Sequence, residues 1–281
     1  MDERPSWLWQ LFSLPVGWRL WPGVALMGVY SLAAGLILEW FDVKPVLWGE
    51  NGAILNGLVL GLLLAFRNNG AYDRWWEGRK LWGQLINDSR NLCLKVRASV
   101  EADAEEVRRF GTLVAGFAFA LKQHLRGGGP LANIPGFEKD EARPAHVPLH
   151  VAGLVLDRLA AWRRAGKLDG YTALALDTHA RALMDICGAC ERIRSTPIAP
   201  SYRTLLRHGI VLYLAAAPWY VLHEEGLWGI PVVMILAYFL LGIELVAESV
   251  EEPFGHDGDD LALDRYCETI RGSVGEVLGT N

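Results

Sequence analysis

Two of the four cysteines in this chain stand at a spacing that can bind a metal ion or form a redox couple. Cys187 and Cys190 form a CxxC pair. A structural zinc site of this type needs a second pair of cysteines, or histidines at ligand spacing, and the sequence shows neither. Both cysteines fall within a helical pattern, so we interpret them as packing thiols.

The usual signatures of enzymatic chemistry are missing from the sequence. It contains no phosphate-binding loop, no metalloprotease motif and no nucleophile elbow. We therefore expect neither enzymatic activity nor a cofactor. The net charge of -5 also argues against nucleic acid as a partner, because proteins that bind it present a basic surface.

One apolar run carries a pattern that suits an ion pathway. Leu58, Leu62 and Phe66 recur every four residues, so they lie on one face of a helix. Gly57 and Gly61 lie on an adjacent face and would let another helix approach closely. Periodicity alone favours a stripe that faces lipid or a core. The alternative is a ring of apolar side chains around a pore that closes by dewetting.

Four apolar runs supply the elements that position this stripe. Residues 20–38 carry no charge and are bracketed by Trp21 and Trp40, which is typical of a membrane-spanning helix. The second run, 51–66, is shorter, and we expect its helix to continue into the cytoplasm as far as Ser99. Runs 208–223 and 226–243 predict an antiparallel hairpin.

The hairpin contains prolines, and positive charge is distributed unevenly around the four runs. Pro218 and Pro231 are expected to kink the two hairpin helices. Residues 67–207 hold 22 of the 27 Lys and Arg residues, which predicts that this region and both termini are cytoplasmic. Arg67 and Arg74 stand where the second helix leaves the membrane, and we interpret them as interfacial anchors. The competing interpretation is a soluble protein with buried core helices.

The predicted fold class is all-α, since no alternation typical of strands is present. An amphipathic helix is expected over 101–126 and two further helices over 151–165 and 169–195. We divide the chain into an interfacial segment (1–19), transmembrane helices 1 and 2 (20–66), a helical cytoplasmic region (67–207), transmembrane helices 3 and 4 (208–248) and a cytoplasmic C-terminal segment (249–281).

Two longer motifs identify a family. Residues 66–82 read FRNNGAYDRWWEGRKLW, and residues 252–261 read EPFGHDGDDL. Together with residues 87–92 they resemble the signature of the bestrophin family in its bacterial branch. The resemblance extends from the first membrane helix to about Gly272. It implies a homopentameric ion channel in a bacterial inner (plasma) membrane, with Leu58, Leu62 and Phe66 as the narrow neck of the pore.

The resemblance also suggests residues on either side of the cytoplasmic vestibule. It places a second constriction, the cytoplasmic aperture, at Leu176, with Leu174 as the alternative. Asn68 and Asn69 follow the neck, and we expect them to face the vestibule and contact hydrated ions.

An acidic cluster near the C-terminus has two interpretations. Asp257, Asp259 and Asp260 correspond to the calcium clasp of animal bestrophins, and a calcium site needs six to eight oxygen ligands. However, His256 and Gly258 stand where the animal pattern has carboxylates. We therefore favour a structural interpretation, in which these aspartates form the first turn of a helix, and keep them as weak metal candidates.

The expected function is passive conduction of monovalent ions, with copies of the chain and membrane lipid as partners. The resemblance implies chloride conduction in animal relatives and monovalent cation conduction in bacterial ones. The acidic excess, multiplied by five subunits, favours cations such as Na⁺. The alternatives are an anion channel of the same architecture, a non-conducting membrane scaffold, and a secondary transporter, whose internal repeats are not seen.

Overall fold

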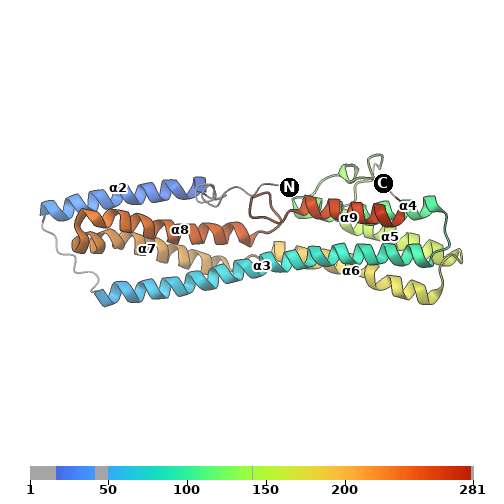
Figure 1. Cartoon of the computed structure of the whole chain (residues 1–281), viewed down its shortest axis with the longest axis horizontal. Helices are drawn as coiled ribbons and strands as arrows, with labels where there is room; N and C mark the ends of the chain where they lie inside the picture. The colour runs from blue at the N-terminus through green and yellow to red at the C-terminus, as the bar shows by residue number, and fades with distance from the viewer. Residues whose placement is uncertain (1–16, 42–49, 141, 280–281) are drawn as a thin grey trace. The chain divides into compact units, whose positions relative to one another are not determined.

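The chain forms helices and no strands over the residues that the structure, a computed structural model, describes: 17–41, 50–140 and 142–279 (Figure 1). The all-α prediction is therefore confirmed. Apart from residues 17–19, the predicted interfacial segment 1–19 lies outside the described residues. The helices are α2 (Gly17–Phe41), α3 (Glu50–Ser99), α4 (Ala104–Leu125), η1 (Leu131–Asn133), α5 (Val147–Arg164), α6 (Gly170–Ser195), α7 (Pro200–Glu225), η2 (Gly226–Trp228), α8 (Gly229–Glu251) and α9 (Leu263–Leu278).

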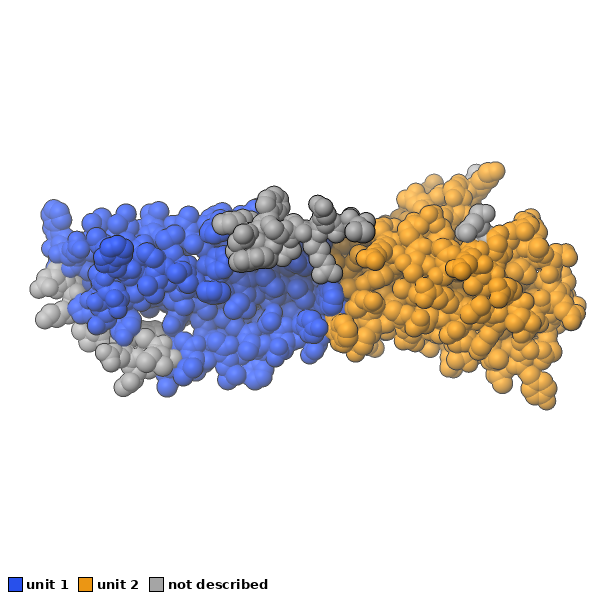
Figure 2. Space-filling model, viewed as in Figure 1, with its two compact units in different colours: residues 1–75, 197–253, 257–259 blue, residues 76–196, 254–256, 260–281 orange. Residues whose placement is uncertain are grey.

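These helices belong to two compact units (Figure 2). Unit 1 comprises residues 1–75, 197–253 and 257–259, and unit 2 comprises residues 76–196, 254–256 and 260–281. The predicted edges of the cytoplasmic region, at residues 67 and 207, both fall inside unit 1. The reason is that Arg67, inside α3, and Arg207, near the start of α7, form ion pairs with acidic residues of α8.

In unit 1, α2, α7 and α8 pack against one another (Figure 1). The stretches Gly17–Phe41 and Pro200–Glu251 are long and apolar enough to cross a membrane, and the second contains the predicted hairpin of α7 and α8. Many of their apolar side chains point outward, such as Leu36 and Phe239. A core helix of a soluble protein would bury them. The shared core is built from Leu60, Leu64, Leu206, Ile210, Leu214 and Ala237.

In unit 2, α4 packs against α5, α6 and α9. The amphipathic pattern predicted the buried face of α4, which includes Phe110, Phe117 and Leu121. The ring of Phe110 contacts that of Trp162 from α5, with centroids 5.2 Å apart.

Local signals account for most helix ends. Asp169 is the N-cap of α6, and its Oδ1 accepts hydrogen bonds from the backbone N–H groups of Tyr171 (2.8 Å) and Thr172 (3.0 Å). Helix α6 ends at Ser195, and Pro200 opens α7, where the missing N–H costs nothing. Helix α3 continues to Ser99 as predicted.

Two predictions of local structure are wrong. Pro231 lies in the first turn of α8. The backbone N–H groups there have no partner within the helix, so the proline removes no helical hydrogen bond and causes no kink. Residues 257–260 do not form the first turn of a helix, since α9 begins only at Leu263 and Asp264 is the acidic residue of its first turn. Pro218 does lie inside α7.

Candidate pore-lining site

Helix α3 presents the predicted apolar stripe on an exposed face. Leu58 is 67% exposed, Leu62 58% and Phe66 60%. A step of four residues turns a helix about 40° past a full turn, so the three side chains cover an arc of about 80° along about 12 Å of helix. Leu60 and Leu64, on the opposite side of the helix, are buried in the shared core. Unit 1 therefore holds α3 by one face and exposes the stripe.

The two glycines beside the stripe behave differently from each other. A Cβ atom on Gly57 would lie 3.1 Å from the hydroxyl of Tyr213, so this glycine does allow close approach of α7. A Cβ atom on Gly61 would meet nothing within 4 Å in the described chain. Of the two glycines predicted to allow close packing, only Gly57 packs against another helix of the described chain. Gly61 is free to face lipid or another subunit.

Arg67 follows the stripe directly and is completely buried. Its Nη2 lies 2.7 Å from Oε2 of Glu251, and its Nε lies 3.6 Å from Oε2 of Glu244. The interpretation of Arg67 as an interfacial anchor is therefore wrong. A buried guanidinium needs carboxylate partners, and α8 supplies two at the level where the stripe ends.

Glu251 connects three segments of unit 1. Its Oε2 accepts from Arg67, its Oε1 accepts from the backbone N–H of Ile198 at 2.9 Å, and its backbone oxygen accepts from Nε of Arg74 at 3.0 Å. Arg207 adds a pair to Glu244, with Nε 2.8 Å from Oε1. The end of α8 thereby fixes the rotation of α3 around its own axis.

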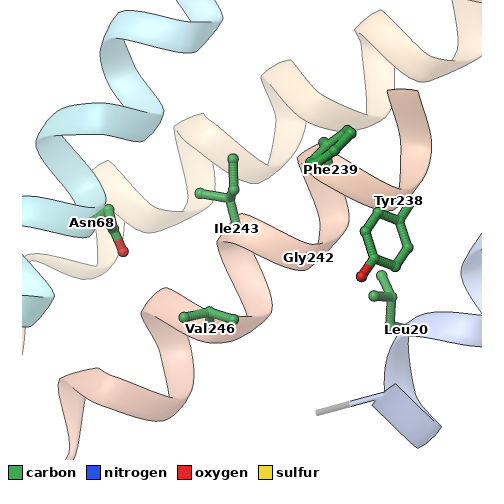
Figure 3. Close-up of a pocket in the computed structure, with 7 residues that line it drawn as sticks. All are labelled: Leu20, Asn68, Tyr238, Phe239, Gly242, Ile243 and Val246. Carbon is green, nitrogen blue, oxygen red and sulfur yellow. The ribbon is translucent and has the colours of Figure 1, made fainter. Parts of the chain in front are cut away.

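The structure separates the two predicted vestibule residues. Asn68 is two residues beyond Phe66, a rotation of about 200°, and therefore lies on nearly the opposite side of α3. It lines a pocket of about 230 Å³ together with side chains of α2 and α8 (Figure 3). Asn69 is rotated by about 300°, which is 60° short of a full turn, and it is exposed on the side of the stripe.

Asp73 is an acidic residue on the face of the stripe that the sequence interpretation missed. It lies seven residues after Phe66, within about 20° of the same direction and about 10 Å further along the helix. Its side chain is exposed. The spacing of seven residues was the signal that could have revealed it.

The two aperture candidates in unit 2 differ completely in exposure. Leu176 is 0% exposed and belongs to the core of α6, whereas Leu174 is 72% exposed. Leu174 lies in a groove of about 920 Å³ between α5 and α6, beside Arg163 and Asp177. A fully buried side chain cannot line an aperture, so the geometry favours Leu174.

The acidic cluster is held by contacts that need no metal ion. Oδ2 of Asp259 accepts from the hydroxyl of Ser249 at 3.1 Å, and the backbone oxygen of Asp259 accepts from Nε1 of Trp75 at 3.0 Å. Asp257 is exposed. Asp260 belongs to unit 2, unlike Asp257 and Asp259. Binding of a divalent ion by this cluster stays a prediction.

The CxxC cysteines are buried in unit 2. Cys187 and Cys190 both have 0% exposure. Burial is the main cause that raises the pKa of the Cys187 thiol to about 12, and the nearby Glu191 carboxylate is a smaller one. A thiol of this kind is protonated at neutral pH and unreactive, as expected of packing cysteines.

Comparison with known proteins then identifies the family. A family model described as bacterial/fungal bestrophin protein matches residues 1–276. The chain belongs to the bestrophin family. This bestrophin is 35% identical to a voltage-dependent anion channel-forming protein of Nostoc sp., over 90% of this chain and 84% of the relative. It is 31% identical to a protein of the same name from Ralstonia nicotianae, over 99% and 95% of the two chains.

Solved structures give the same result for the fold. The chain superposes on a bacterial bestrophin homologue from Klebsiella pneumoniae with a TM-score of 0.85 and 25% identity, covering 92% of this chain and 98% of the other. Family membership and the names of the relatives identify this bestrophin as a membrane ion channel rather than an enzyme.

Proposed function

We propose that five copies of this bestrophin surround one axis and conduct monovalent ions passively between their α3 helices. The observation that carries the proposal is the exposed stripe of Leu58, Leu62 and Phe66, on a helix whose opposite face is buried. In a ring of subunits this stripe becomes a neck without charge, which controls conduction by its width and wetting. Asn69 then faces the vestibule, and Leu174 forms the cytoplasmic aperture.

Alanine substitutions test the neck. The triple variant L58A/L62A/F66A should raise single-channel conductance in planar bilayers by at least about twofold, because smaller side chains widen and wet the pore. The matched control is L32A/L36A/F41A, which removes the same side-chain types from exposed positions of α2. Equal conductance of the neck variant and the parent would refute the assignment.

The same recording separates the channel from its alternatives. A pore gives ohmic single-channel currents, a secondary transporter gives saturable flux, and a scaffold gives no current. The control variant must behave as the parent does in each case.

The sign of the permeant ion divides the proposal into two versions. The relatives are named as anion channels, which favours chloride. The exposed Asp73 carboxylate and the net charge of -5 favour Na⁺ or K⁺. A reversal potential in asymmetric NaCl decides between them, since it moves toward the equilibrium potential of the ion that permeates.

We place both termini and unit 2 on the cytoplasmic side of a bacterial inner membrane. Positively charged residues near the membrane ends, including Arg79 and Arg203, support this orientation. A reporter that is active only in the cytoplasm should be active when fused to the C-terminus, and a reporter that is active only in the periplasm should not.

A further inference from the structure

Unit 2 holds a cluster of metal-ligand side chains that the proposed channel function does not use. His124 comes from the last turn of α4, His146 is the N-cap of α5, and Glu191 comes from α6. Oε1 of Glu191 lies 2.6 Å from Nε2 of His124 and 2.8 Å from Nε2 of His146. The three ligand atoms all lie within 4.8 Å of one another.

We propose that His124, His146 and Glu191 bind one divalent transition-metal ion, for which zinc is the best match. Two imidazoles and one carboxylate are a ligand set that zinc accepts, with water completing the tetrahedron. Calcium and magnesium prefer sites made of oxygen ligands. The side chains of His124, His146 and Glu191 are 26%, 31% and 36% exposed, so an ion can enter from solvent and keep a water ligand.

The cluster needs a small adjustment to accept zinc. Bonds of about 2.0–2.1 Å in a tetrahedral site keep neighbouring ligand atoms about 3.3 Å apart. The present contacts of 2.6 and 2.8 Å are therefore hydrogen bonds that must open by about 0.5–0.7 Å. The three side chains come from three different elements, and a rotation about their side-chain torsions provides this movement.

His146 must also change its tautomer. Its Nδ1 accepts a hydrogen bond from the backbone N–H of Leu149 at 3.1 Å, so the proton of the neutral ring is on Nε2 and is donated to Glu191. Ligation through Nε2 moves that proton to Nδ1 and gives up the cap of α5. One capping bond is small compared with the binding energy of a structural zinc ion.

Cys187 lies near the proposed site but is not one of its ligands. It lies one turn before Glu191 on α6 and is fully buried. The three ligand atoms that lie within 4.8 Å of one another belong to His124, His146 and Glu191, so the metal is left to nitrogen and oxygen ligands.

Calorimetric titration with zinc alone tests the site. The full-length protein is used in detergent, without an affinity tag and after treatment with a chelator. We expect one zinc ion per chain and a zinc-dependent increase in the unfolding midpoint. The variants His124→Gln and His146→Asn should each weaken binding at least about tenfold. Asn at position 146 keeps a good N-cap residue, so that variant separates metal binding from helix capping.

Two controls distinguish ligands from bystanders. His179 also contacts a carboxylate, with Nδ1 2.8 Å from Oδ1 of Asp88, but as a single pair. His179→Gln should leave zinc binding unchanged. Cys187→Ser should likewise leave zinc binding unchanged, because the site uses nitrogen and oxygen ligands.

The proposal is overturned by either of two results. One is the absence of saturable zinc binding by the parent protein, which would leave the cluster as a hydrogen-bonded network. The other is equal zinc affinity of the parent and the double variant His124→Gln/His146→Asn, both shown to be folded by circular dichroism. Neither result bears on the neck, since conductance is measured separately.

Discussion

Arg67 illustrates how one buried charge orients the helix that carries the apolar stripe. The residue next to Phe66 is enclosed by unit 1 and neutralised by Glu251 and Glu244. An arginine in this position cannot rotate toward an ion pathway without breaking its pairs with Glu251 and Glu244. The direction of the stripe is therefore linked to a buried ion pair.

Removing this arginine should destabilise unit 1 strongly. We expect Arg67→Met to lower the free energy of unfolding by about 3–5 kcal/mol, because it removes the guanidinium that pairs with the buried Glu251 carboxylate. Arg19→Met removes the more exposed pair with Glu248 and should cost no more than about 1 kcal/mol. Denaturant unfolding in detergent measures both, and equal losses would show that burial of the Arg67 pair is unimportant.

Asp73 should influence the charge of the permeant ion. Five exposed carboxylates about 10 Å beyond the neck create a negative ring. Asp73→Asn should lower the ratio of cation to anion permeability by several fold, and the effect should decrease at high salt. The control Asp103→Asn removes the same charge at the start of α4. Identical reversal potentials for Asp73→Asn and the parent would remove Asp73 from the conduction pathway.

At the scale of elements, one carboxylate of α9 pairs with two basic residues at the C-terminal end of α4. Oδ1 of Asp264 lies 2.8 Å from Nζ of Lys122, and Oδ2 lies 2.7 Å from Nη1 of Arg126. The hydrogen bond from Lys122, together with the one from Arg126, lowers the pKa of the Asp264 carboxyl from 3.8 to about 2. This contact joins the two helices through their polar edges.

The shift predicts acid sensitivity of unit 2. A folded-state pKa below the unfolded value stabilises the protein above about pH 4, and this stabilisation is lost as the pH falls from about 4 to about 2. Because the side chain is largely exposed, the contribution should not exceed about 1 kcal/mol. Asp264→Asn should reduce the dependence of unfolding free energy on pH in this window. An unchanged dependence would contradict the pairing.

Sequence predicts the elements well where the signal is local. The length of α3 follows from an uninterrupted run of helix-forming residues, and the limits of α6 follow from Asp169 and the prolines after Ser195. The start of α9 was predicted too early, because the aspartates at 257–260 lie in the loop before the helix and not in its first turn. Leu174 and Leu176 are two residues apart, and only the tertiary packing of α6 decides which of them is buried.

The candidate site shows the same limit. Spacing predicted that Leu58, Leu62 and Phe66 share a face, and the structure exposes that face. Spacing could not reveal that Arg67 is buried, because its partners are on α8, far along the chain. The cluster of His124, His146 and Glu191 was equally invisible, since its members come from three separate elements.

At the scale of the whole molecule, the proposal requires five chains. A monomer presents the apolar stripe to solvent or lipid, whereas a ring turns the five stripes toward one axis. Native mass spectrometry in detergent should give five times the chain mass of 31.1 kDa. A stable monomer or dimer that still gives single-channel currents would contradict this arrangement.

The junction at Glu251 has a consequence for how conductance can be tuned. This one side chain receives Arg67 from α3 and the backbone N–H of Ile198 from the segment that precedes α7. Any ligand, modification or substitution that displaces that segment pulls on the residue adjacent to Phe66. In the proposed channel, substitutions in this short connecting strip should therefore alter the current, and laboratory selection for altered currents should recover changes there as well as in the passage itself.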